Sequence, residues 1–281
     1  KKVFNVIKLQ TLVFPGRELP QSEALYFHVE QGALPLLSQA KVLLPRLSVV
    51  RTETFFNGFS IGKWRSACQI DDLGLALTGT GRVLVRIGVN ILDHASRWLR
   101  EDVITLSGQP TELDIEALSE ITDGQIFFQI TALEDATLTG GFYFTKAKAR
   151  NDVRLGIVVT HFNRKHYVLP AIRRVTTQLL NDPEIEGRIE LVVVDNSSNI
   201  TAEEACGATL IPNLNLGGAG GFTRGLLHLK DNGFTHCLFM DDDASCEIES
   251  IRRTLRILQF ARSPNLAIAG SMLREAAPHV L

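Results

Sequence analysis

The chain has 281 residues, of which 45% are hydrophobic and 21% are charged, and its formal net charge is -2. This ordinary globular composition can fill two cores, and the near-neutral charge gives no reason to expect nucleic acid or an acidic partner. The four cysteines form no CxxC pair and show no metal-ligand spacing, which favours a reducing, cytoplasmic compartment. No apolar run is long enough for a membrane span, and the residues after Lys1-Lys2 lack the pattern of a signal peptide.

Residues 1–150 are predicted to form a β domain. Residues 83–91 place an apolar side chain at every second position, which is typical of a strand with one buried face. Shorter apolar runs between turn residues indicate further strands, so an all-β sandwich or jelly roll is expected. The shorter strands are expected at Val3–Ile7, Lys41–Leu44, Thr111–Ile115, Gln125–Ala132 and Thr137–Thr145, with turns at 14–16, 78–81 and 122–124.

After a polar hinge at residues 146–152, the pattern changes to apolar strands that alternate with helices. The alternation predicts an α/β domain over residues 151–281, with a mostly parallel, Rossmann-like sheet that is covered on both faces. Strands are expected at Leu155–Val159, Ile189–Val194, His236–Met240 and Leu266–Ala269, and helices at Tyr167–Leu180, Gly221–Leu229 and Glu247–Ala261.

Four polar segments lie at or just beyond the ends of the expected strands. Ligands of parallel sheets bind beyond the carboxyl ends of the strands, so these segments should converge on one edge. The glycine-rich segment matches neither GxxxxGK[ST] nor GxGxxG, although glycines before a helix allow a ligand to approach the backbone closely. The four segments are Thr160–Arg164, Asp195–Asn199, the glycine-rich residues 213–224 and Asp241–Asp243.

The polar residues of these segments each have two interpretations. Three adjacent carboxylates repel one another unless a cation or solvent answers their charge, and Asp oxygens suit Mg²⁺ or Mn²⁺. The alternative is a solvated acidic turn that caps the next helix. Arg164 is either a surface cation or a donor to a diphosphate. Asp195 either opens an Asx-turn or accepts hydrogen bonds from a ribose or a base.

Taken in order, the segments resemble the nucleotide-sugar half of a GT-A glycosyltransferase of the large inverting family 2. More narrowly, they are similar to bacterial galactofuranosyltransferases. The similarity rests on Thr-His-Phe-Asn-Arg (160–164), Val-Val-Asp-Asn-Ser-Ser (193–198), Asn-Leu-Gly-Gly-Ala-Gly-Gly-Phe-Thr-Arg-Gly (215–225) and Phe-Met-Asp-Asp-Asp-Ala (239–244). Thr-Phe-Phe-Asn-Gly-Phe (54–59) with Lys63-Trp64-Arg65 resembles the motif of the β-sandwich that precedes the catalytic domain in this family, and Trp64 itself is expected in the core.

The resemblance implies transfer of a sugar from a UDP-sugar, most narrowly UDP-galactofuranose, to a cell-wall or surface glycan. It implies that Asp241 and Asp243 bind Mn²⁺ or Mg²⁺ at the diphosphate. Asp195 would contact the uridine, Arg164 the diphosphate region, and Asp242 the sugar or ribose. The residues expected to contact the donor are Thr160, Arg164, Asp195, Asn215, Gly218 and Asp242.

The chain departs from the family pattern after the Asp triplet. In the family, a carboxylate that acts as general base and a metal-binding histidine follow downstream. Glu247 and Glu249 fit roles at a helix N-terminus, while Glu275 and His279 receive no role. We therefore expect the chain to continue past Leu281 and the general base to lie there.

The expected partners are a UDP-sugar donor and a glycan or lipid-linked glycan acceptor, with no nucleic acid. Arg252, Arg253 and Arg256 are interpreted as a solvated helix face, with contact to anionic lipid at the inner face of the membrane as the alternative. Homo-oligomerisation is left open. The rival functions are a rhamnosyl- or other hexosyltransferase and a non-catalytic carbohydrate-binding or scaffold protein. A nucleotidyltransferase should show a basic glycine-rich loop at the first strand, and residues 160–164 contain no glycine.

Overall fold

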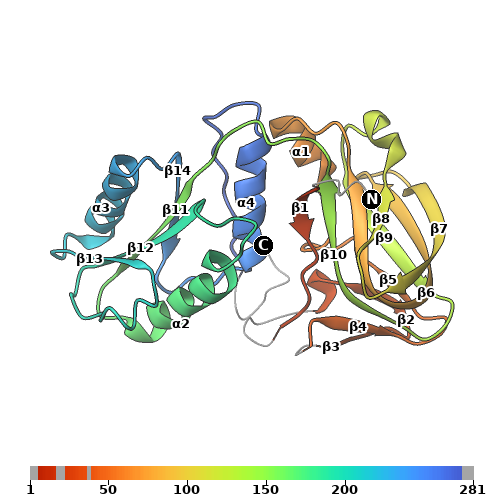
Figure 1. Cartoon of the computed structure of the whole chain (residues 1–281), viewed down its shortest axis with the longest axis horizontal. Helices are drawn as coiled ribbons and strands as arrows, with labels where there is room; N and C mark the ends of the chain where they lie inside the picture. Colours follow the sequence, from red (N-terminus) through yellow and green to blue (C-terminus); the bar gives the residue numbers. More distant parts are fainter. Residues whose placement is uncertain (1–5, 17–22, 37–38, 274–281) are drawn as a thin grey trace. The chain divides into compact units, whose positions relative to one another are not determined.

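The computed structural model describes residues 6–16, 23–36 and 39–273, which fall into two compact units (Figure 1). Unit 1 comprises Lys1–Arg150 and Phe260–Leu281, and unit 2 comprises Asn151–Gln259. The division lies beside the expected hinge, but it groups the chain from Phe260 onward with unit 1. An antiparallel β region thus precedes a parallel sheet, as expected, and the sandwich and GT-A assignments stay predictions.

Unit 1 is an antiparallel structure in which the described strands form one ten-stranded sheet. Its main order is β2-β5-β9-β6-β10-β4-β3, with β1 paired to β10 and both β7 and β8 paired to β6. The strands are β1 (Ile7–Thr11), β2 (His28–Gln31), β3 (Leu34–Leu36), β4 (Lys41–Leu44), β5 (Val49–Arg51), β6 (Gly74–Asn90), β7 (Arg97–Ser107), β8 (Thr111–Asp114), β9 (Gln125–Ala132) and β10 (Ala136–Thr145). The helical segments are α1 (Ile61–Ala67) and the 3-10 turns Glu23–Leu25 and Glu116–Glu120.

The central strand β6 confirms the predicted alternation and corrects one predicted turn. Val83, Val85, Ile87 and Val89 are all buried, as a strand with one core face requires. The turn expected at residues 78–81 is wrong, because these residues lie inside β6. Their glycines serve close strand packing: a Cβ on Gly79 would lie 2.0 Å from the carbonyl oxygen of Thr137. The first strand also differs, since β1 begins at Ile7, and residues 1–5 lie outside the described part.

The segment 54–59 is structural in unit 1. Asn57 is fully buried, and its side-chain amide donates to the carbonyls of Val13 and Tyr26 while its oxygen accepts from the Val13 N–H. Trp64 is 5% exposed, and its ring stacks on Phe59 at 5.5 Å between centroids. The predicted core position of Trp64 is confirmed.

Unit 2 contains a parallel sheet in the order β13-β12-β11-β14 among its described strands. The carboxyl ends of parallel strands share one edge, so the segments that follow them are brought together. The elements are β11 (Leu155–His161), α2 (Lys165–Val175) with a π-helical turn at Thr176–Leu180, β12 (Ile189–Asp195), β13 (Thr209–Pro212), α3 (Gly217–Asp231), β14 (His236–Asp241) and α4 (Ile248–Phe260).

One expected strand of unit 2 is wrong and another was missed. Residues Leu266–Ala269 are described and form no strand. The fourth strand is instead β13, which pairs with β12 from Val192↔Thr209 to Asp195↔Pro212. Its four residues end at a proline, so the segment carries little strand signal of its own and is held by its neighbour.

Helix α3 packs on one side of the sheet, with α2 and α4 on the other (Figure 1). Its glycines form the packed face: a Cβ on Gly221 would lie 2.2 Å from Thr160 Cγ2, and a Cβ on Gly225 would lie 2.3 Å from Val158 Cγ1. Helix α3 begins at Gly217, four residues before the expected start, so most of the glycine-rich segment is helix rather than loop. Close packing on β11 thus fixes where the N-terminus of α3 lies.

Replacing Gly225 with alanine should destabilise unit 2 by about 1–3 kcal/mol, because the added methyl group overlaps Val158 in a packed core. Gly218→Ala is the matched control, since nothing lies within 4 Å of a Cβ at that helical position. Urea unfolding followed by far-ultraviolet circular dichroism measures both. Equal losses in the two variants would contradict the packing role.

Candidate functional site

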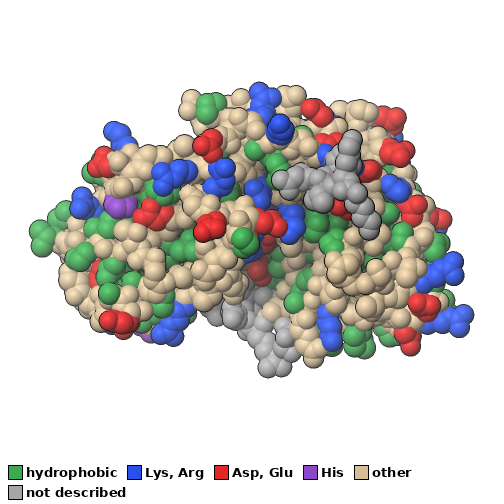
Figure 2. Space-filling model, viewed as in Figure 1, with side chains coloured by type: hydrophobic (Ala, Val, Ile, Leu, Met, Phe, Trp, Pro, Cys, Tyr) green, Lys and Arg blue, Asp and Glu red, His purple; other side chains and the backbone are tan. Residues whose placement is uncertain are grey.

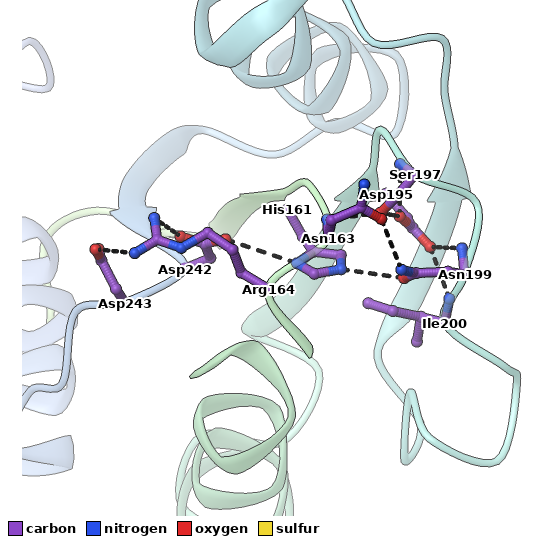
Figure 3. Close-up of polar contacts among 9 residues, drawn as sticks. All are labelled: His161, Asn163, Arg164, Asp195, Ser197, Asn199, Ile200, Asp242 and Asp243. Atoms are coloured by element: carbon purple, nitrogen blue, oxygen red, sulfur yellow. Dashed lines mark hydrogen bonds and ion pairs between the residues drawn. The ribbon is translucent and has the colours of Figure 1, made fainter. Parts of the chain in front are cut away.

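The ends of three strands assemble one polar site in unit 2 (Figure 3). In the register of the sheet, Thr160 pairs with Asp241 and His161 pairs with Asp195. The segment after β11, the loop after β12 and the Asp triplet after β14 therefore lie side by side. The convergence expected from the sequence is present for these three segments, and the glycine-rich segment joins them through α3.

Asp195 organises the loop that follows β12. Its Oδ1 accepts from the N–H and the hydroxyl of Ser197 at 2.9 and 2.8 Å, and its Oδ2 accepts from the N–H groups of Asn199 and Ile200 at 2.7 and 2.8 Å (Figure 3). The residue is 1% exposed. Burial opposes the charge, but the hydrogen bonds from Ile200, Ser197 and Asn199 outweigh it and hold the pKa of Asp195 below its usual value.

The four acceptor positions of the Asp195 carboxylate are thus occupied by its own loop. The Asx-turn interpretation describes this geometry. A direct contact between the carboxylate and a nucleoside would require one of these bonds to break. Recognition by the backbone of loop 195–200, which Asp195 holds in shape, requires no such loss.

Arg164 forms ion pairs with two carboxylates of the Asp triplet. One guanidinium nitrogen donates to Asp242 Oδ1 at 3.1 Å and another to Asp243 Oδ2 at 2.6 Å (Figure 3). The hydrogen bond to Asp243 is the main cause that raises the pKa of Arg164. The Arg164 side chain is 44% exposed, and its guanidinium lies 5.0 Å from the centroid of the Tyr167 ring. The triplet is therefore more than a solvated acidic turn, because one cation links two of its carboxylates.

The chemistry of Asp241 and Asp243 fits a hard cation that is shared with a ligand. Both residues are exposed, and a hydrogen bond from the Ala244 N–H to the Asp241 carbonyl closes the turn that carries them. Within the described residues, no three His, Cys, Asp or Glu side chains form a group that could hold a metal by themselves. Mg²⁺ sites often use only one or two carboxylates, with water and substrate phosphates as the other ligands. The two carboxylates suit that kind of site.

The glycine-rich segment meets the site through Asn215 and the first turn of α3. Asn215 Oδ1 accepts from the Gly217 N–H at 3.1 Å, and the Asn196 amide donates to the Gly217 carbonyl at 3.3 Å. Gly218 is exposed and has open space on its Cβ side. Thr160 instead faces the inner side of α3, where its hydroxyl is buried and has no hydrogen-bond partner in the described structure.

His161 is the site residue that sequence reasoning missed. It is fully buried, and its two ring nitrogens face Asn199 and Asp242. In the sequence it stands inside Thr-His-Phe-Asn-Arg (160–164), at a strand end where polar residues of such sheets gather.

The arginines of α4 do not form a solvated basic face, so that interpretation is wrong. Each makes hydrogen bonds or ion pairs within unit 2, and burial lowers the pKa of Arg256. The contacts are Arg252 with Asp182, Glu249 and the Gln178 carbonyl, Arg253 with Glu249, and Arg256 with Glu184 and Gln259. This pairing also removes the reason to expect a lipid contact there. Among the described residues, no helix has both the length and the apolar character needed to cross a membrane.

Among the described residues after the Asp triplet, we assign no glutamate as a general base. Glu249 lies in the first turn of α4, and Glu247, which precedes the helix, has a carboxylate 4.0 Å from Arg174. Both positions fit the helix N-terminal role expected from the sequence. Glu275 and His279 lie outside the described residues.

Comparison with known proteins shows which family these segments resemble. Residues 156–269 match the glycosyl transferase family 2 description, and the match includes all four polar segments. This part of the chain is similar to family 2 glycosyltransferases. In the matched region the parallel sheet supplies the edge at which Arg164, the Asp195 loop and the Asp triplet meet.

Two curated relatives are similar to more of the chain than residues 156–269. The chain is 29% identical over 251 residues to the galactofuranosyltransferase GlfT2 of Mycobacterium tuberculosis, covering 82% of this chain and 38% of that protein. It is 29% identical over 255 residues to GlfT2 of Mycolicibacterium smegmatis, covering 82% and 37%. The chain thus spans less than half the length of these relatives.

Two solved structures of carbohydrate-binding modules show a weak likeness to the chain. A family 29 carbohydrate-binding module is 9% identical with a TM-score of 0.30, covering 50% of this chain and 84% of that one. A family 6 module is 10% identical with a TM-score of 0.26, covering 51% and 95%. A likeness of this degree assigns no ligand to the chain.

Proposed function

We propose that the chain is the donor-binding part of a metal-dependent, inverting glycosyltransferase with a β-sandwich followed by a GT-A domain. The proposed donor is UDP-galactofuranose, and the product extends a cell-wall or surface glycan. The observation that carries the proposal is the meeting of Arg164, loop 195–200 and the Asp triplet at one sheet edge. The family 2 match and the two galactofuranosyltransferase relatives support it.

Each part of the site has a role that its chemistry suits. Loop 195–200 offers backbone groups to the uridine, and the guanidinium of Arg164 offers paired donors to the diphosphate. Asp241 and Asp243 hold Mn²⁺ or Mg²⁺, which when bound stabilises charge on the departing diphosphate as a Lewis acid. Asn215 and Gly218 line the same edge at the start of α3, close to where a sugar diphosphate would lie.

The transfer itself needs a group that the described residues do not offer. The acceptor hydroxyl attacks the anomeric carbon from the face opposite UDP, a C–O bond forms while the bond to the diphosphate breaks, and a base takes the hydroxyl proton. Asp242 is held by Arg164, and the acids near the start of α4 lie beside arginines. We assign no general base among the described residues.

The proposed setting is the cytoplasm, with a glycan or a lipid-linked glycan as acceptor. On the face shown in Figure 2, basic and acidic side chains are interspersed, as expected for a chain with a formal net charge of -2. Such a surface has no broad basic field for nucleic acid.

A panel of nucleoside diphosphates tests the function. Calorimetry in the presence of Mn²⁺ should show that UDP binds at least about tenfold more tightly than thymidine or guanosine diphosphate. Guanine lacks the hydrogen-bonding edge of uracil, and thymidine diphosphate adds a methyl group to the base and lacks the 2′-hydroxyl of the ribose. Preference for another nucleotide would favour the rival hexosyltransferases. Absence of nucleotide binding would support the scaffold alternative and contradict the proposal.

Replacing Arg164 with glutamine should change two affinities in opposite directions. Without the guanidinium, Asp243 is released and a positive charge near the cation is lost, so Mn²⁺ should bind the nucleotide-free chain severalfold more tightly. UDP at saturating Mn²⁺ loses its charge-assisted contact and should bind about tenfold more weakly. Manganese paramagnetic resonance and calorimetry measure the two constants.

Arg188→Gln is the control for Arg164, because Arg188 is also paired with an exposed carboxylate, that of Asp152, but takes no part in the site. It should leave both affinities unchanged. If Arg164→Gln moved both affinities in the same direction, the shared role of Asp243 would be refuted.

A further inference from the structure

We propose that His161 is a positioning residue that couples the nucleoside side of the donor site to its metal-diphosphate side. The inference rests on the proposed function, because it assigns these two sides of the site to the two halves of a UDP-sugar. It adds a linkage between them that runs through one buried imidazole.

On one side, His161 holds the loop after β12. Its Nε2 lies 3.1 Å from Asn199 Oδ1, and the Asn199 N–H donates to Asp195 at 2.7 Å. The Asn199 amide also donates to Asn163 Oδ1 at 3.2 Å, which ties the loop to the segment after β11. The imidazole therefore contacts the residue through which Asp195 shapes the nucleoside loop.

On the other side, His161 faces the Asp triplet. Its Nδ1 lies 3.6 Å from Asp242 Oδ2, and Arg164 holds the other oxygen of the same carboxylate at 3.1 Å (Figure 3). Asp242 is only 7% exposed, so its position depends on these partners. If Arg164 moves from Asp243 toward a diphosphate, its hydrogen bond to Asp242 changes too. The Asp242 carboxylate then shifts relative to the His161 ring that it faces.

The imidazole occupies a position where an apolar residue would suit the core. Ile157 and Val159 precede it on the same face of β11 and are fully or almost fully buried. A buried polar side chain is costly unless its groups find partners. Nδ1 has no hydrogen-bond partner in the described structure, and Asp242 lies just beyond bonding distance. A neutral imidazole that donates from Nε2 to Asn199 Oδ1 carries no proton on Nδ1, so Nδ1 and Asp242 Oδ2 face each other as two acceptors. A movement of Asp242 therefore changes the position that the ring can take against Asn199, and this is the linkage between the two sides of the site.

The test measures the linkage directly. The Kd of Mn²⁺ for the chain is determined by paramagnetic resonance with and without saturating uridine, a nucleoside that has no phosphate to touch the metal. In the unmodified chain uridine should tighten Mn²⁺ binding about fivefold, a typical coupling between two sites. In His161→Phe the ratio should fall to about one, and in His161→Gln, which keeps a donor, part of it should remain.

Controls separate positioning from stability. His228→Phe removes another histidine of unit 2, which lies 3.3 Å from Glu190 away from the site, and should keep the full ratio. Asn199→Ala removes the contact of the loop with His161, so the ratio of the Mn²⁺ Kd values without and with uridine should also fall to about one. This variant replaces His161→Phe in the test if His161→Phe does not fold. An unchanged ratio in folded His161→Phe or Asn199→Ala would overturn the proposal.

The outcome also distinguishes this inference from the proposed function. If the unmodified chain binds neither Mn²⁺ nor UDP, the proposed function fails. If it binds UDP with Mn²⁺ but uridine leaves the Mn²⁺ affinity unchanged, the donor site stands and only the coupling through His161 is refuted.

Discussion

Replacing Asp241 and Asp243 together with alanine should weaken UDP binding in Mn²⁺ by about a hundredfold or more and remove its dependence on the metal. The two carboxylates are the only protein ligands that we assign to the cation, and a metal bound to two carboxylates and a diphosphate loses most of its affinity without them. In the variant the ion pair between Arg164 and Asp242 still holds the guanidinium in the site. A weak contact between Arg164 and the diphosphate, independent of the metal, should therefore remain. Calorimetry with and without Mn²⁺ measures the effect.

The double variant should fold normally, because both carboxylates are exposed and exposed ion pairs contribute little to stability. Asp152→Ala is a suitable control, since it removes another exposed, arginine-paired carboxylate of unit 2 away from the site. It should bind UDP as the unmodified chain does. Equal UDP affinity in the double variant and the control would remove the metal role from the triplet.

Replacing Asp195 with alanine should have the largest effect on stability. The carboxylate accepts four hydrogen bonds at a position that is 1% exposed, and three of the donors are backbone N–H groups. Leaving buried donors without an acceptor costs about 1–3 kcal/mol each, so unit 2 should lose roughly 3 kcal/mol or more even after the loop relaxes. Urea unfolding followed by far-ultraviolet circular dichroism gives the loss. A change below about 1 kcal/mol would mean that the loop does not depend on Asp195.

The pH dependence of stability gives a second test of Asp195. Its pKa is lower in the folded chain than the ordinary value of about 3.9, so the folded state favours the charged form. That contribution is complete above about pH 4 and is lost as the pH falls through the folded pKa. Asp195→Asn should therefore be less stable than the unmodified chain at neutral pH and should lose less on acidification. If the free energy of unfolding fell equally with pH in the two proteins, the lowered pKa of Asp195 would be contradicted.

The core strands of unit 2 could be predicted from the sequence. Continuous apolar runs at Leu155–Val159, Ile189–Val194 and His236–Met240 are typical of strands in a parallel sheet, and all three form strands. Full burial is found for β11 and β12 but not for β14, where Phe239 is 50% exposed. The strand β13 could not be predicted. Its residues are no more strand-like than Leu266–Ala269, and only pairing with β12 distinguishes the two segments.

The site shows a similar limit. The order of Arg164, Asp195 and the Asp triplet predicted which residues would meet, because the ends of parallel strands share an edge. The hydrogen-bond partners of these side chains could not be predicted from their order in the sequence. Arg164 links Asp242 to Asp243, and Asp195 uses its whole carboxylate on its own loop, because hydrogen-bond capacity is settled only once the loops are placed. His161 was missed for the same reason.

The central claim is that this sheet edge binds UDP together with a divalent metal. It is tested most directly by calorimetric titration of the chain with UDP, first with Mn²⁺ and then with a chelator in its place. We expect one UDP per chain with Mn²⁺ and a loss of affinity of at least about tenfold without it. No binding, or equal binding with and without Mn²⁺, would contradict the account.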